Sequence, residues 1–286
     1  MKNKYSTLFR FDRLSTTLVV TAIITIFLAR AWLASSIPAP RTFEVFDTLT
    51  VAGAFLVLMK SHRNLRRDDW IIALILGAVI GVEMLFASLF SPYPFFGIVR
   101  DKIGQAWIRG SLTFLAALGG LAIMRQGGPV QLHAANGNWR ETSRGILLGL
   151  AMGLPLALLN VFALQMTQGQ SAQWQKPMPA LLDALQPGIV EEVIYRFALW
   201  GLLWLILQRS LPQQAIWLAG LLAMLTHTYS HFDDLFIQSP LTALGMGAAL
   251  ALLWGLPPLI LARRRGLESA IAFHWIQDAA RFMTGF

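Results

Sequence analysis

Long apolar segments limit the folds open to this chain more than any other feature. They lie near positions 14–35, 45–60, 70–90, 104–124, 145–167, 180–207, 212–230, 240–262 and 267–284. A helix needs roughly 20 apolar residues to cross the ~30 Å hydrocarbon core of a bilayer, and in lipid its backbone must hydrogen-bond to itself. We therefore predict an all-α fold, a polytopic transmembrane bundle of eight or nine spans. The number is eight or nine because the second segment is short and the last is amphipathic.

The composition agrees with a membrane protein and excludes several other classes. Only 13% of the residues are charged and 56% are hydrophobic, whereas a soluble domain carries about 25% charged residues. The net charge of +8 is spread over short gaps between apolar segments, which argues against a nucleic-acid partner. The chain has no cysteine, so disulfides, thiolate chemistry and cysteine-based metal sites are excluded.

The distribution of basic residues predicts the orientation. Lys and Arg gather in every second gap, as at Arg66, Arg67 and positions 263–265, while the alternate gaps hold few of them. The positive-inside rule then places the N-terminus in the cytoplasm, and we expect an integral protein of a bacterial plasma membrane. A turn-rich loop at 125–144 separates N-terminal transmembrane helices (1–140) from a C-terminal helix bundle (141–286) within one integral domain.

Ionisable pairs occur on three of the C-terminal apolar segments, each with i,i+4 spacing that places both members on one helix face. These pairs are Glu192 with Arg196, His227 with His231, and His274 with Asp278. Lipid cannot satisfy such groups, so they must face one another or a wet cavity. We therefore expect the helices carrying Glu191, His227 and His274 to be neighbours around one polar cavity. An intramembrane ionisable cluster of this kind predicts a functional site.

The residue types suggest a division of roles. Glu192 and Arg196 can neutralise each other, which leaves Glu191 as the acid without an intrahelical partner and a candidate general base toward water. A nearby histidine can share that water, and Asp278 can orient His274 for an electrophilic role. These pairs can also be explained without a functional role. Glu192 and Arg196 could form a buried structural ion pair, and the segment around His227 and His231 could be a polar turn at the membrane interface.

The three pairs taken together resemble the CPBP family of intramembrane proteases, which includes CAAX prenyl proteases and bacteriocin-processing (abortive-infection) enzymes. The family signature is EExxxR, FxxxH and HxxxN/D on successive helices, and this chain carries Glu191-Glu192-x-x-x-Arg196 and His274-x-x-x-Asp278 in that order. The resemblance covers about 180–285. Ala223 stands where the second motif has Phe, and His227 is the expected histidine of that motif, with His231 as a second candidate.

The resemblance implies a role for each matching residue. Glu191 would activate the hydrolytic water together with His227, and His274 and Asp278 would stabilise the tetrahedral oxyanion. Because an ionised Asp278 would oppose an oxyanion, it should be protonated or act only through His274. Glu192 and Arg196 would support the site. The family was first regarded as metalloenzymes. Members are now described as glutamate-dependent proteases, so the resemblance implies no cofactor.

Alternatives to a metal-free protease stay open on the residues alone. The i,i+4 histidines suit zinc, so His227, His231 and Glu191 form a candidate metal set. A non-proteolytic immunity or partner-binding protein of the same fold, or a proton-coupled transporter, would also carry buried ionisable groups. Our leading interpretation is an intramembrane endopeptidase acting on a membrane-associated protein or peptide.

Overall fold

The computed structural model describes residues 42–89 and 95–286, together with residues 17, 20, 21, 24, 25 and 28. Within these residues the protein is helical throughout and has no β-strand, only an isolated bridge between Phe95 and Val99. The predicted all-α fold is therefore confirmed. The predicted first span, near 14–35, lies outside the described residues except for six positions within it.

Three long helices form the N-terminal part: α2 (Thr42–Ser61), α3 (Arg67–Phe86) and α4 (Lys102–Arg125), with a short 3-10 turn, η1 (His62–Asn64), between the first two. The Asp101 side chain caps α4 by accepting a 2.7 Å hydrogen bond from the Gly104 N–H. Inside the bundle, Arg109 of α4 donates to Asp47 of α2 over 2.7 Å, and both side chains are buried. A buried charge is tolerated only when it is paired in this way, so this pair connects α2 to α4.

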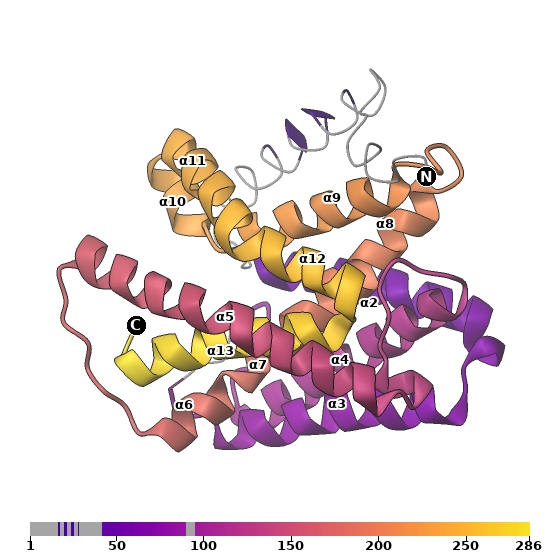
Figure 1. Ribbon diagram of the computed structural model, residues 1–286, viewed down its shortest axis with the longest axis horizontal. Helices are drawn as coiled ribbons and strands as arrows, with labels where there is room; N and C mark the ends of the chain where they lie inside the picture. The colour runs from indigo at the N-terminus through magenta and orange to yellow at the C-terminus, as the bar shows by residue number, and fades with distance from the viewer. Residues whose placement is uncertain (1–16, 18–19, 22–23, 26–27, 29–41, 90–94) are drawn as a thin grey trace, which may run out of the picture.

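The longest helix, α5 (Trp139–Gln168), follows a turn containing η2 (Ala134–Asn136), and it lies beside the final helix α13 (Leu267–Thr284) (Figure 1). A row of glycines makes this close approach possible. A Cβ on Gly149 would lie 2.2 Å from the Ser269 carbonyl oxygen, and one on Gly153 would lie 2.9 Å from that of Phe273. Small residues spaced by four commonly bring membrane helices this close.

The C-terminal part is built from shorter helices. The chain passes through α6 (Pro177–Asp183), α7 (Leu185–Glu191), η3 (Glu192–Leu199) and α8 (Trp200–Leu207), then α9 (Ala215–Tyr229) and α10 (Asp233–Gln238), and finally α11 (Pro240–Leu250), η4 (Ala251–Gly255) and α12 (Leu256–Arg265). The segments η3 and η4 are π-helical. Short π-helical segments inside α-helices are often found at functional sites.

Five helices are long and apolar enough to span a membrane, namely 42–64, 67–86, 102–125, 139–168 and 240–265. The predicted number of eight or nine spans is not confirmed among the described residues. Three C-terminal segments differ from these five: α9 has 15 residues, and 185–207 and α13 each carry several charged side chains. In 185–207 these charges are Glu191, Glu192 and Arg196, so the groups that suggest a site also make this helix a weak span. The predicted cytoplasmic N-terminus stays a prediction.

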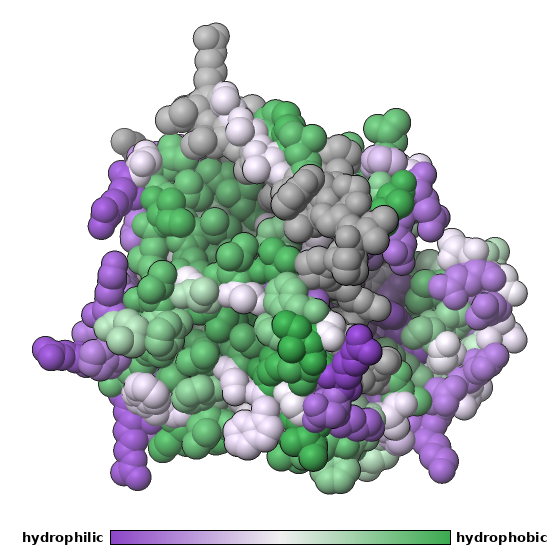
Figure 2. Space-filling model, turned by 180° about the vertical axis from the view of Figure 1, so that it is seen from behind, coloured by the Kyte–Doolittle hydropathy of each residue, from purple (hydrophilic) through white to green (hydrophobic). Residues whose placement is uncertain are grey.

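The segment η3 lies in the interior, where α2, α4, α8 and α9 pack around it. Gly120 of α4 allows this packing, because a Cβ there would lie 2.4 Å from the Phe197 ring. Around this interior the surface is strongly apolar: the face shown in Figure 2 is largely hydrophobic, with hydrophilic side chains gathered toward its left and right margins. Such a distribution fits an integral membrane protein.

Candidate active site

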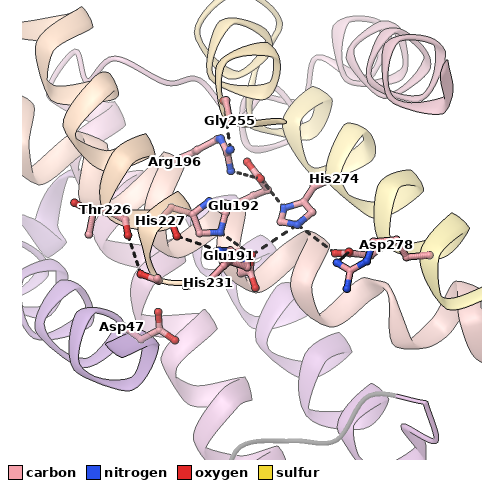
Figure 3. Close-up of polar contacts among 12 residues, drawn as sticks. Asp47, Glu191, Glu192, Arg196, Thr226, His227, His231, Gly255, His274 and Asp278 are labelled. Carbon is pink, nitrogen blue, oxygen red and sulfur yellow. Dashed lines mark hydrogen bonds and ion pairs between the residues drawn. The ribbon is translucent and has the colours of Figure 1, made fainter. Parts of the chain in front are cut away.

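The adjacent acids Glu191 and Glu192 lie where α7 gives way to η3, and they point to different partners. Glu192 is fully buried, whereas the Glu191 side chain is 17% exposed. Consecutive residues of a helix project about 100° apart, so neighbouring positions serve two different faces. The Glu191 carboxylate therefore points toward His227, and the Glu192 carboxylate points toward Arg196 and His274 (Figure 3).

Three histidines surround the Glu191 carboxylate: His227 from α9, His231 from the turn that follows α9, and His274 from α13. His227 of α9 is closest, with Nε2 2.6 Å from Glu191 Oε2. The Nε2 atoms of His274 and His231 lie 3.7 and 3.9 Å from the same oxygen. The structure thus brings Glu191, His227 and His274 together around one carboxylate oxygen, as their polar faces predicted. This cluster can hold and move a proton.

Glu192 forms the internal half of the site. Its Oε1 accepts a close hydrogen bond from Arg196 Nη1 one turn later, and it lies 2.8 Å from His274 Nδ1. Arg196 Nη2 also donates, over 3.5 Å, to the Gly255 carbonyl of η4. The predicted Glu192–Arg196 pair is therefore present, but Glu192 also connects η3 to α13. Sequence reasoning missed this second contact, which joins residues 82 positions apart.

His274 lies between carboxylates on both sides. Its Nδ1 faces Glu192, while Nε2 lies 3.2 Å from Asp278 Oδ2. A neutral imidazole has one N–H donor, whereas the imidazolium has two, so two carboxylate partners favour the protonated ring. Asp278 is in turn paired with Arg281, whose Nη1 donates to Oδ1 over 3.0 Å. Arg281 therefore offsets the charge of Asp278 next to His274.

Aromatic rings fix His227 from behind. The Tyr195 ring stacks on it with centroids 4.7 Å apart and planes inclined by 28°. Phe43 of α2 meets His227 edge-on at 6.3 Å and His231 at 4.9 Å. Tyr195 and Phe43 were not predicted from the sequence, and only the presence of Tyr195 inside the EExxxR motif could have drawn attention to it. Together the rings hold the His227 imidazole against Glu191.

His231 occupies the more open side of the site. Its Nδ1 lies 3.2 Å from the His227 carbonyl oxygen, and its side chain is 44% exposed. Ligand atoms of Glu191, His227 and His231 all lie within 4.8 Å of one another. Zinc in catalytic sites takes three such protein ligands and one open position. The donor set therefore fits zinc as well as it fits a metal-free acid–base site.

A cavity of about 260 Å³ opens beside these groups. Its wall includes His227, His231, His274 and Asp278, and two residues of α5, Asn160 and Leu164, also line it. A larger apolar groove of about 640 Å³ runs between α3 and α4, and none of the predicted site residues line it. The smaller cavity is therefore the one with access to the ionisable cluster.

The fold and site together define a helical integral membrane protein with a buried glutamate–histidine cluster. Residues 173–280 match the family model described as type II CAAX prenyl endopeptidase Rce1-like. This match contains every predicted site residue and confirms, over these residues, the resemblance noted from the motifs. A search of curated proteins and a search of solved structures returned no match. The family is a protease family, which supports a hydrolase of membrane location.

Proposed function

We propose that the protein is an intramembrane endopeptidase in which Glu191 and His227 activate water for direct attack on a peptide bond. The observation that carries this proposal is the 2.6 Å contact of Glu191 Oε2 with Nε2 of His227, a residue that lines the cavity. A carboxylate held in this way can take a proton from water when it lies within hydrogen-bond reach. The family match supplies the reaction class.

The chemical steps follow from the arrangement. The water oxygen bonds to the carbonyl carbon while its proton passes to Glu191, and the carbonyl oxygen becomes an oxyanion. The Nε2–H of His274 stabilises this charge, because a preorganised donor in a water-poor site is effective there. The carbon–nitrogen bond then breaks, and the leaving amine takes the proton back from Glu191. No covalent enzyme intermediate is formed.

Supporting residues keep the charges in balance during these steps. Glu192 faces His274 Nδ1 and Arg196, so it orients the imidazolium. Asp278 lies beside His274 Nε2, and its pairing with Arg281 reduces the repulsion that a free carboxylate would exert on an oxyanion. In this proposal Asp278 acts through His274.

A zinc-dependent version is the second candidate, favoured by the compact set of Glu191, His227 and His231. A bound zinc ion would supply an activated water. Glu191 would then be occupied as a ligand and could not also act as a free base, and His231 would be as necessary as His227. In the metal-free site His231 only borders the cavity.

The substrate class proposed is a peptide or protein segment that reaches the site from the membrane. The family description names CAAX prenyl endopeptidases, so an S-farnesylated peptide with three residues after the modified cysteine is the first probe. The test is cleavage of this probe and of its unmodified counterpart by purified protein, followed by mass spectrometry. Glu141→Gln, a partly exposed glutamate paired with Arg144, is the matched control for Glu191→Gln. Equal cleavage by the wild type and Glu191→Gln would overturn the proposal.

A further inference from the structure

One polar side chain on the cavity wall is not used by the proposed mechanism. Asn160 lines the cavity together with His274 and Asp278. It is the one polar residue of α5 between Arg144 and Gln165. A polar side chain in an apolar membrane helix carries a free-energy cost, and packing alone would favour leucine at this position.

The fold brings Asn160 to the cavity through the contact of α5 with α13. Gly149 and Gly153 allow the two helices to pack closely because they have no Cβ. Gln277 Nε2 also donates to the Gly153 carbonyl over 2.9 Å. Asn160 follows Gly153 by seven residues, which returns it to nearly the same helix face two turns later. This places it on the α13 side of α5, where the cavity opens.

The Asn160 amide makes no hydrogen bond with any residue that the structure describes. An asparagine side chain offers two N–H donors and a carbonyl acceptor. Apolar side chains such as Leu164, Leu250 and Phe273 make up much of the wall around it. A peptide backbone presents the complementary pair, one N–H and one C=O per residue, and pairing would satisfy both partners.

We propose that Asn160 is a substrate-binding residue whose amide hydrogen-bonds to the backbone of the peptide lying in the cavity beside the scissile bond. The inference rests on the proposed endopeptidase function and adds a specificity contact to it. Because the contact is to backbone atoms, it selects an extended peptide segment and is independent of side-chain identity.

The experiment combines a protein variant with altered substrates. The probe is an internally quenched S-farnesylated peptide, and a second set of probes replaces one backbone amide at a time by an ester. An ester removes the N–H donor and weakens the neighbouring carbonyl acceptor. We expect Asn160→Leu to lower kcat/KM on the amide probe about tenfold, the size of one lost hydrogen bond in a dry site. Leu159→Met, at a lipid-facing position of the same helix, should leave kcat/KM unchanged.

The ester probes separate a binding role from a structural one. Wild type should lose about tenfold in kcat/KM at one particular ester position, while Asn160→Leu should cleave the amide and that ester equally well. Thermal stability of Asn160→Leu should equal or exceed that of the wild type. The inference is overturned, with the proposed function left standing, if Asn160→Leu lowers kcat/KM by the same factor on every ester probe. The same holds if Asn160→Leu causes no loss of kcat/KM while cleavage still depends on Glu191. Absence of Glu191-dependent cleavage overturns the proposed function and, with it, the inference.

Discussion

Glu191 and His227, separated by 36 positions in the chain, meet with Oε2 and Nε2 2.6 Å apart. The two residues come from α7 and α9, and the Tyr195 ring holds His227 in place by stacking. A contact of this length between a carboxylate and an imidazole is a charge-assisted hydrogen bond when either group is ionised. It places a proton acceptor next to His227, which lines the cavity.

Replacing Glu191 by glutamine should abolish turnover without unfolding the protein. The amide keeps the volume of the side chain but cannot take a proton from water, and loss of a general base costs typically 100-fold or more. Cleavage of the farnesylated peptide, measured by mass spectrometry, should fall at least ~100-fold, with thermal stability unchanged. Glu141→Gln should retain full activity. A folded Glu191→Gln variant with normal turnover would exclude Glu191 as the base.

Replacing Glu192 by glutamine should instead lower stability. Glu192 is fully buried and accepts from Arg196, so its loss leaves a buried unpaired guanidinium. Breaking one side of such a pair costs roughly 3–5 kcal/mol. We expect a lower thermal midpoint and a lower yield of monodisperse protein. The double variant Glu192→Gln/Arg196→Met should be less destabilised than Glu192→Gln, and the reverse order would show that the pair is not coupled.

The metal-free and zinc mechanisms make opposite predictions for His231. Without metal, exhaustive chelation should leave activity intact, elemental analysis should find no stoichiometric metal, and His231→Ala should keep most of the activity while His227→Ala loses it. With zinc, both alanine variants should be equally damaged, and added metal should restore chelated wild type. Activity after chelation and the metal content per chain decide between them.

The contact of α5 with α13 should be sensitive to a single methyl group. A Cβ on Gly149 would lie 2.2 Å from the Ser269 carbonyl oxygen, and forcing extra volume into a packed contact costs typically 1–3 kcal/mol. Gly149→Ala should therefore lower the thermal midpoint and reduce activity through displacement of His274. Gly245→Ala is the matched control, because nothing lies within 4 Å of a Cβ there. That variant should be neutral or slightly stabilised. Equal stability of the two variants would contradict the packing argument.

The sequence by itself determined the class of fold and the candidate residues. Apolar length and the low fraction of charged residues predict helices in a membrane, because lipid offers no partner for an open backbone. Pairs such as Glu192 with Arg196 and His274 with Asp278 follow from helix geometry, which brings i and i+4 together in any surroundings. The three motifs were sufficient to recognise the family over the region that its model matches.

Only the tertiary structure decided which of these pairs meet. The contacts of Glu191 with His227, and of Glu192 with His274, join residues on different helices. Their distances depend on how closely the helices pack, which glycines such as Gly120 and Gly149 permit. The described helices do not confirm the predicted eight or nine spans, for a related reason. Charges that make 185–207 and α13 poor spans by composition are neutralised by one another in the interior, and that pairing exists only in the folded bundle.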